Sequence, residues 1–246
     1  MHEQGKELDA SSIIREEDHY TIYELCFERD GMRIYGNLYL PKEEKEQYPT
    51  AILAHGFGGS YSYNVPYAEA LAENGIAGYV FDFCGGSSGS RSDGDTLQMS
   101  VLTEQEDMEA VLEGMKAYRF VDRENIFLMG ESQGGMVAAL LAASRPEEIQ
   151  GLALLYPAFV IPDDARKRYT SEEDVPESSH IFGVPVGRIY YTDVLDMDVY
   201  REISGFDKNV LIIHGSMDGT VPIAYSERAV DEVYSSAELV VLDGAG

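Results

Sequence analysis

The sequence predicts an α/β fold in which a mostly parallel sheet of about eight strands carries helices on both faces. Short apolar runs alternate with amphipathic segments along most of the chain. Each run is apolar through its whole length, as expected of strands that are buried on both faces of a sheet. The length of 246 residues suits one domain of this class, so we expect a single domain over residues 1–246.

The chain is expected to open with a β-hairpin. YTIYELCFE and MRIYGNLYL are rich in β-branched and aromatic residues, and Arg29-Asp30-Gly31 lies between them as the turn. The buried strands that follow are expected at 50–56, 76–83, 125–130, 151–157, 209–215 and 239–244.

Four helices are expected between these strands, at 66–74, 101–118, 133–145 and 223–234. The second helix has the clearest buried stripe, formed by Met108, Val111, Leu112, Met115 and Tyr118. Thr103 and Glu106 are expected to form a capping box at its start.

Residues 158–208 separate two expected core strands by much more chain than an ordinary connection needs. We therefore expect them to form an inserted lid. The segment is rich in aromatic residues, namely Phe159, Tyr169, Phe182, Tyr190 and Tyr191. For each aromatic side chain, a place in a small satellite core is the alternative to a place in a binding site.

The chain is strongly acidic, with 44 acidic and 18 basic residues and a formal net charge of −26. This charge repels phosphate backbones and anionic lipids, so neither nucleic acid nor a membrane is expected as a partner. Cys26 and Cys84 lack metal-type or redox spacing and are expected to be free thiols in a reducing cytosol. With no apolar leader, the chain is predicted to be cytoplasmic, without metal or cofactor. A homodimer remains open.

The clearest chemical motif is Gly130-Glu131-Ser132-Gln133-Gly134. It follows the apolar run NIFLM and opens the apolar segment QGGMVAALLAA, which is the strand–turn–helix setting of a nucleophile elbow. Glycines are needed there because the turn is too tight for neighbouring side chains. Ser132 is thus the candidate nucleophile. The alternative is a helix-capping serine in an inert turn.

Two backbone N–H groups should stabilise the oxyanion in a hydrolase of this kind. One is expected from Gln133, next to the nucleophile, and the other from Phe57 in the loop His55-Gly56-Phe57-Gly58-Gly59. His55 is expected to fix this loop by hydrogen bonds rather than to act as the catalytic base.

A third motif, HGSMDGTVP, follows the run VLII late in the chain and contains Asp218. A triad in the order serine, acid, histidine places the acid in such a loop, where it orients the imidazole. Alone, a loop aspartate is more often a turn residue.

With these motifs, the chain resembles the α/β-hydrolase-fold serine esterases from about residue 20 to its end. The stretches that carry the resemblance are HGFGG, FDFCGGSSGS, GESQGG, HGSMDGTVP and LDGAG. It is most similar to the bacterial cinnamoyl and feruloyl esterases, which implies hydrolysis of small-molecule carboxylic esters with the lid against the acyl group. In that family, an acidic residue and a tyrosine of the lid bind the phenolic hydroxyl of the substrate. Asp164 and Tyr190 are the nearest matches.

The resemblance also implies that the catalytic histidine comes directly after Gly246 and is followed by a closing helix. The histidines present are His2, His19, His55, His180 and His214, and none follows the last expected strand. The competing interpretation is a protein that has lost its base and only binds ligands. On the enzymatic side, a lipase, a thioesterase and an acylaminoacyl-type peptidase remain alternatives to the esterase, because each would use the same site.

Overall fold

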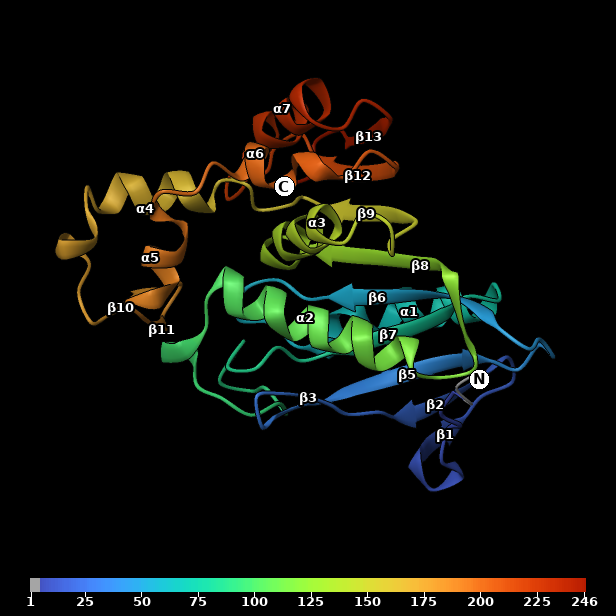
Figure 1. Cartoon of the computed structure of the whole chain (residues 1–246). Coiled ribbons are helices and arrows are strands. Elements are labelled where there is room, and N and C mark those ends of the chain that lie inside the picture. Colours follow the sequence, from blue (N-terminus) through green and yellow to red (C-terminus); the bar gives the residue numbers. More distant parts are fainter. Residues whose placement is uncertain (1–4) are drawn as a thin grey trace.

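A computed structural model describes residues 5–246 and has a central nine-stranded sheet in the order β1-β2-β5-β7-β6-β8-β9-β12-β13 (Figure 1). The strands are β1 Ile13–Glu16, β2 Tyr20–Glu24, β5 Gly36–Pro41, β6 Tyr48–Ala54, β7 Ala77–Phe81, β8 Val121–Glu131, β9 Gly151–Leu155, β12 Asn209–Gly215 and β13 Ala237–Leu242. From β7 to β13 all neighbours in this order are parallel. The predicted α/β class is confirmed.

The N-terminal hairpin forms, but it is more divided than predicted. β2 pairs with β5 in the main sheet, while β3 (Phe27–Arg29) and β4 (Met32–Ile34) make a separate two-stranded ribbon. Its turn has two residues, since Arg29 pairs with Met32, and both Asp30 and Gly31 have positive φ. The edge strand β1 was not predicted, because all four of its residues are exposed and its sequence carries no burial pattern.

The principal helices lie close to their predicted positions. They are α1 Val65–Glu73, α2 Val101–Lys116, α3 Gln133–Ser144 and α7 Ala224–Glu232. α2 and α3 pack against each other and cover one face of the sheet, and α1 covers part of the other face (Figure 1). In residues 5–246, no helix is long and apolar enough to span a bilayer.

Beside α1, the sheet face over β8, β9 and β12 is open. A groove of about 480 Å³ lies there, and its wall includes Phe127, Met129, Ala153 and Leu211. These four side chains are half-buried, whereas their neighbours Leu128 and Leu152, which point to the α3 side, are buried.

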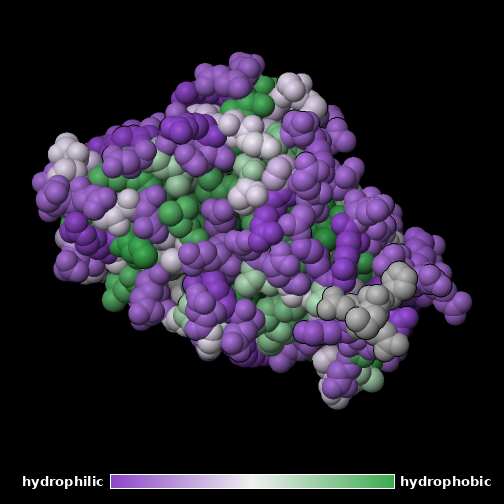
Figure 2. Space-filling model, in the orientation of Figure 1, coloured by the Kyte–Doolittle hydropathy of each residue, from purple (hydrophilic) through white to green (hydrophobic). Residues whose placement is uncertain are grey.

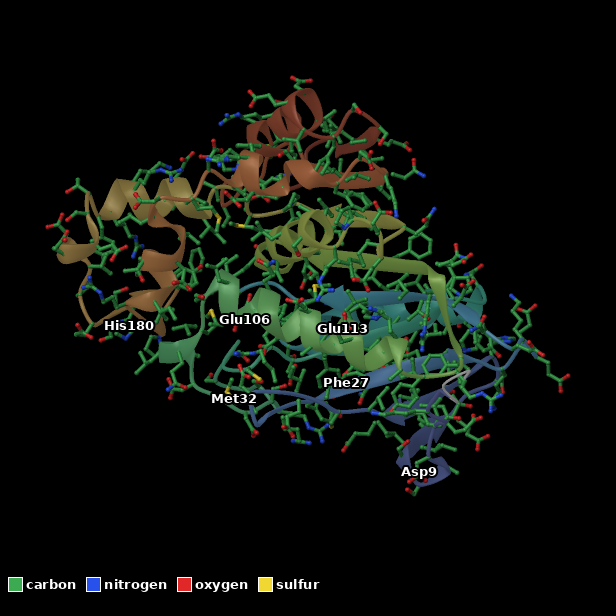
Figure 3. The ribbon with its side chains drawn as sticks, viewed as in Figure 1. Asp9, Phe27, Met32, Glu106, Glu113 and His180 are labelled. Atoms are coloured by element: carbon green, nitrogen blue, oxygen red, sulfur yellow. The ribbon has the colours of Figure 1, made fainter. Side chains whose placement is uncertain are left out.

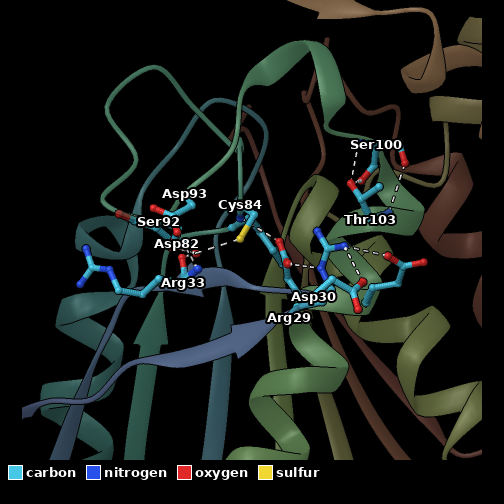
Figure 4. Close-up of polar contacts among 12 residues, drawn as sticks. Arg29, Asp30, Arg33, Asp82, Cys84, Ser92, Asp93, Ser100 and Thr103 are labelled. Atoms are coloured by element: carbon cyan, nitrogen blue, oxygen red, sulfur yellow. Dashed lines mark hydrogen bonds and ion pairs between the residues drawn. The ribbon is translucent and has the colours of Figure 1, made fainter.

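The start of α2 differs from its prediction. Ser100 is the N-cap: its Oγ accepts from Thr103 N–H at 3.2 Å, and Thr103 Oγ1 accepts from Ser100 N–H at 2.9 Å (Figure 4). The predicted capping box of Thr103 with Glu106 is wrong, because the helix begins one turn earlier. The predicted stripe from Met108 to Met115 is buried, while Tyr118 lies just past the helix end.

A buried ion pair ties the ribbon β3–β4 to α2. Arg29 Nε donates to Asp107 Oδ1 at 2.6 Å, and Cys84 N–H donates to Asp107 Oδ2 at 2.8 Å (Figure 4). Burial raises the pKa of the Cys84 thiol to about 12. Cys26 and Cys84 are both free thiols, as predicted.

Residues 158–208, here called the insertion, lie beyond the carboxyl ends of β6, β8 and β9 (Figure 1). The insertion contains α4 Ile161–Arg168, β10 Ser178–Ile181, β11 Val184–Gly187, α5 Ile189–Leu195 and α6 Val199–Glu202. Phe159, Tyr190 and Tyr191 belong to the main hydrophobic core rather than to a satellite core. Figure 2 shows apolar atoms gathering on the insertion side of a face that is otherwise mainly hydrophilic.

Candidate active site

Ser132 lies in the tight turn between β8 and α3. Its backbone has φ 51° and ψ −119°, a conformation that a non-glycine residue adopts only under strain. Its amide donates to Leu155 O at 2.9 Å and its carbonyl accepts from Ala158 N–H at 2.8 Å. The turn is therefore held by the segment that leaves β9, and the strand–turn–helix setting expected of a nucleophile elbow is present.

The glycines of the elbow are required by close backbone contacts. A Cβ on Gly130 would lie 2.2 Å from Gly134 O, and a Cβ on Gly134 would lie 2.4 Å from His55 O. Since these neighbours are backbone atoms of packed elements, they cannot move aside for a side chain.

The two backbone N–H groups expected to form the oxyanion hole belong to Phe57 and Gln133. Within residues 5–246, no hydrogen-bond acceptor is found for the amides of Phe57 and Gln133. The Phe57 loop lies against the nucleophile, because a Cβ placed on Gly56 would be 3.7 Å from Ser132 Oγ. Gln133 begins α3, so its free amide also lies at the positive end of that helix.

His55 fixes this loop, as the sequence predicts. Its Nδ1 is 2.8 Å from Gly56 O, and its Nε2 accepts from Phe83 N–H at 3.3 Å. The ring is fully buried, and burial lowers its pKa. In a neutral ring with its proton on Nδ1, both nitrogens form hydrogen bonds. Neither is free to act as a base for Ser132.

Asp218 lies in the loop after β12 and has two roles open to it. Its Oδ1 accepts from the N–H groups of Thr220 and Val221 at 2.8 and 2.9 Å, which is a turn contact. Its Oδ2 is 3.6 Å from His214 Nε2, but that nitrogen is already 2.8 Å from Val221 O. Among the described residues, Oδ2 accepts no hydrogen bond within normal distance and can accept from another group.

The histidines of the described chain do not supply a base. His214 is buried, with Nδ1 against Ser226 Oγ at 2.8 Å and Nε2 against Val221 O. His19 and His180 are exposed, and Figure 3 shows His180 at the outer edge of the insertion. Within residues 5–246, no hydrogen bond joins a histidine to Ser132, and His2 lies outside the described residues.

The last residues of the chain pack onto the Asp218 loop. Met217 N–H donates to Ala245 O at 2.7 Å, and Ser216 Oγ accepts from Gly244 N–H at 2.9 Å. A Cβ on Gly246 would lie 2.5 Å from Met217 O and 3.3 Å from Asp218 N. Gly246 is therefore held beside the backbone of Asp218.

A cavity of about 490 Å³ opens at Ser132 between the core and the insertion. Part of its wall is aromatic: Phe57 packs edge-on against Tyr190, with ring centroids 5.6 Å apart, and against Phe182 at 6.3 Å. Tyr191 forms a further part of the wall. A flat, apolar group attached near Ser132 would be enclosed by these rings.

Both predicted binding residues line this cavity, in different ways. Tyr190 is buried, and its hydroxyl donates to Gln133 Oε1 at 2.8 Å. Asp164 lies on α4 at the exposed rim, where its Oδ1 accepts from Lys167 Nζ at 2.8 Å. The structure therefore brings Phe57, Ser132, Gln133, Asp164 and Tyr190 to one cavity.

Glu104 of α2 is a buried residue of this site that the sequence analysis missed. Its Oε2 accepts from Gln133 Nε2 at 2.8 Å, so Gln133 bridges Glu104 and Tyr190. Burial raises the pKa of the Glu104 carboxyl well above its ordinary value, and its Oε1 has no hydrogen-bond partner in the described chain. Glu104 lies four residues before Met108, so a glutamate on the apolar stripe of α2 was the available signal.

Replacing Glu104 with glutamine is expected to flatten the dependence of stability on pH. The folded protein holds the Glu104 proton above the pH at which the unfolded chain releases it, so the free energy of unfolding falls as pH rises above about 4.5. The largest slope from one such group is about 1.4 kcal/mol per pH unit. The glutamine in Glu104→Gln cannot ionise. Urea unfolding should therefore show that its free energy of unfolding, relative to that of the wild type, is higher at pH 8 than at pH 5.

The matched control is Glu106→Gln on the same helix, whose side chain is 59% exposed. This variant should keep the pH slope of the wild type. Parallel unfolding curves for Glu104→Gln and the wild type at both pH values would contradict a neutral buried Glu104.

The strained serine, the two free amides and the mostly parallel sheet define this protein as a serine hydrolase of the α/β-hydrolase fold. The class agrees with the resemblance drawn from the sequence. Residues 46–179, more than half of the chain, match the model of the family described as serine aminopeptidase, S33, and the chain belongs to that family.

Individual relatives are consistent with this class. An uncharacterized protein of Mycobacterium tuberculosis is 28% identical over 89% of this chain and 69% of its own length. Caffeoylshikimate esterase of Arabidopsis thaliana is 30% identical over 68% of this chain and 49% of its own length. Among solved structures, Est1E of Butyrivibrio proteoclasticus with bound ferulic acid is similar, with a TM-score of 0.82 and 28% identity over 89% of each chain.

Proposed function

We propose that this chain hydrolyses carboxylic esters of aromatic acids, including hydroxycinnamoyl esters, through an acyl-enzyme on Ser132. The observation that carries the proposal is a strained serine in a cavity whose lining includes four aromatic side chains. The likeness to Est1E with ferulic acid and to a caffeoylshikimate esterase supports the same substrate class.

In the proposed reaction, Ser132 Oγ attacks the ester carbonyl and its proton passes to a histidine base. The carbonyl oxygen becomes an oxyanion that accepts hydrogen bonds from Phe57 N–H and Gln133 N–H. The alcohol then leaves with the proton from the base. A water molecule, deprotonated by the same base, attacks the acyl-enzyme and releases the acid.

We propose that the base is the residue directly after Gly246, with Asp218 as the acid of the triad. Support comes from the contact of Gly246 with the Asp218 loop, because a side chain on the next residue starts beside Asp218. The free Asp218 Oδ2 could accept its Nδ1–H. The open apolar groove over β8, β9 and β12 offers a site for a closing helix beyond that residue.

For hydroxycinnamoyl substrates, we propose that the aromatic ring lies between Phe57, Phe182 and Tyr190. Asp164 at the rim is a carboxylate that can accept a hydrogen bond from the phenolic hydroxyl. Tyr190 already donates to Gln133, so its oxygen would take part only as an acceptor.

The proposal is tested on the full-length protein with an ester panel and a fluorophosphonate probe. The probe should label Ser132, and methyl ferulate should be hydrolysed faster than long aliphatic esters. A preference for long aliphatic esters, thioesters or peptides would contradict the aromatic-ester proposal. It would indicate a lipase, a thioesterase or a peptidase, respectively. Absence of labelling would favour a binding protein on the hydrolase fold.

A further inference from the structure

We propose that the far end of the Ser132 cavity is an anion-binding subsite built on Arg168, so that the preferred acyl groups end in a carboxylate. The inference rests on the proposed function, because it concerns the acyl group that Ser132 receives. It adds a substrate class to that function: aromatic esters with an acidic group at the end opposite the ester.

The charge of the cavity is opposite to that of the chain. The cavity wall contains one carboxylate, Asp164, and two cations, Lys167 and Arg168. The wall therefore has a net positive charge, whereas the whole chain has a formal net charge of −26. A bound anion would be attracted there and repelled by most of the remaining surface.

The two cations differ in how they are neutralised. Lys167 Nζ is 2.8 Å from Asp164 Oδ1, so this pair cancels. Arg168 donates to the neutral Tyr191 hydroxyl at 3.0 Å, and within residues 5–246 no carboxylate lies within 4.0 Å of its guanidinium. One of its five N–H donors is used in this way, which leaves a planar edge for a carboxylate.

Arg168 lies away from the nucleophile, at the end of a series of contacts that begins at Gln133. Gln133, next to Ser132, is bonded to Tyr190, and the rings of Tyr190 and Tyr191 are 5.4 Å apart between centroids. The guanidinium carbon of Arg168 lies 6.0 Å from the Tyr191 ring centroid. Two aromatic rings thus separate the reacting end of the cavity from the cation.

Arg168 is exposed, and on the cavity side it contacts a hydroxyl that is itself hydrogen-bonded. The Tyr191 hydroxyl that it meets is also 2.9 Å from Ser179 Oγ, so the residue to which Arg168 donates is itself held in place. A flat acyl group between the aromatic walls would direct its terminal substituent toward this guanidinium. A carboxylate can pair with it through two parallel hydrogen bonds, which a phenol cannot do.

The test compares methyl 4-carboxycinnamate with its neutral isostere, methyl 4-carbamoylcinnamate, in the full-length enzyme. The wild type should prefer the acidic ester, and the preference should shrink at high salt. Arg168→Gln should lower the ratio of kcat/KM values by roughly tenfold, mainly through KM, because one charge-assisted contact is lost. The kcat/KM of the neutral ester is the reference within each enzyme.

Arg166→Gln is the matched control on the same helix. Arg166 bonds to Leu195 O, Met197 O and Asp163 and does not line the cavity, so its loss removes the same charge elsewhere. The substrate ratio should stay at its wild-type value. An Arg168→Gln enzyme with an unchanged ratio, or a wild type that prefers the neutral ester, overturns the anion subsite while ester hydrolysis stands.

A binding measurement on an inactive variant tests the anion subsite independently of ester hydrolysis. Calorimetry on Ser132→Ala should show tighter binding of 4-carboxycinnamate than of 4-carbamoylcinnamate, and Arg168→Gln in that background should remove the difference. These ligands share the carboxylate at the Ser132 end and differ only at the far end. If no ester is turned over but this difference is present, the proposed hydrolysis fails and the subsite stands; equal binding overturns the subsite.

Discussion

Ser132→Ala is expected to reduce ester turnover by about 10⁴-fold or more. The hydroxyl is the atom that forms the acyl-enzyme, and no other group can replace it in the elbow. The fold should survive, because alanine keeps the Cβ and the strained backbone of Ser132, whose φ is 51°. The measurement is steady-state hydrolysis of methyl ferulate and p-nitrophenyl acetate by the full-length protein, with thermal unfolding alongside.

Ser60→Ala is a suitable control, because Ser60 follows the Phe57 loop and its hydroxyl is 2.8 Å from Ser62 Oγ. It should retain wild-type turnover. If Ser132→Ala hydrolysed both esters at the wild-type rate, Ser132 would not be the nucleophile.

Asp218→Asn is expected to lower kcat by about 10³–10⁴-fold while leaving the fold intact. The structure separates the two roles of this side chain. Asparagine Oδ1 can still accept from Thr220 N–H and Val221 N–H, so the turn is preserved. What is lost is the negative charge that would orient the imidazole and stabilise its protonated form. Activity and thermal unfolding measured on one preparation would show both outcomes.

Asp243→Asn provides the comparison for Asp218→Asn. Asp243 is exposed in the neighbouring loop and accepts from Ser216 Oγ at 3.2 Å, so the variant removes a charge nearby without touching the Asp218 carboxylate. It should remain active. Full activity of Asp218→Asn would show that Asp218 is a turn residue and not the acid of a triad. Its hydrogen bonds to Thr220 and Val221 are consistent with that alternative.

The parallel half of the sheet could be predicted because its strands are apolar through their whole length and end in glycine or charge. β1 could not, since an exposed edge strand needs no apolar pattern. The cap of α2 was placed one turn late because Ser100 and Thr103 are both good cap residues. Which of them begins the helix depends on tertiary contacts, including the hydrogen bond from Ser100 Oγ to Asp193 of the insertion.

For the site, motif spacing was enough to locate Ser132, Gln133 and Phe57 at one edge of the sheet. Asp164 and Tyr190 came only from family resemblance, and they line the same cavity. The hydrogen bonds of Gln133 with Tyr190 and Glu104 could not be read from the sequence, because both depend on which helices meet at Gln133. The hydrogen bond of Arg168 to Tyr191, with no carboxylate beside it in residues 5–246, depends in the same way on packing within the insertion.

The bond between Tyr190 and Gln133 has a consequence for access to the cavity. Gln133 is anchored on the core side by buried Glu104, whereas Tyr190 belongs to α5 of the insertion. An outward displacement of α5 would therefore break a single neutral hydrogen bond at this point, worth about 1 kcal/mol, and leave the elbow and its anchor in place. Tyr190 is also buried in the main hydrophobic core, so the same displacement would expose apolar surface. The packing of Tyr190, more than its hydrogen bond, therefore sets the cost of moving α5 away from the cavity, while the contacts that hold Gln133 to Glu104 lie outside the insertion.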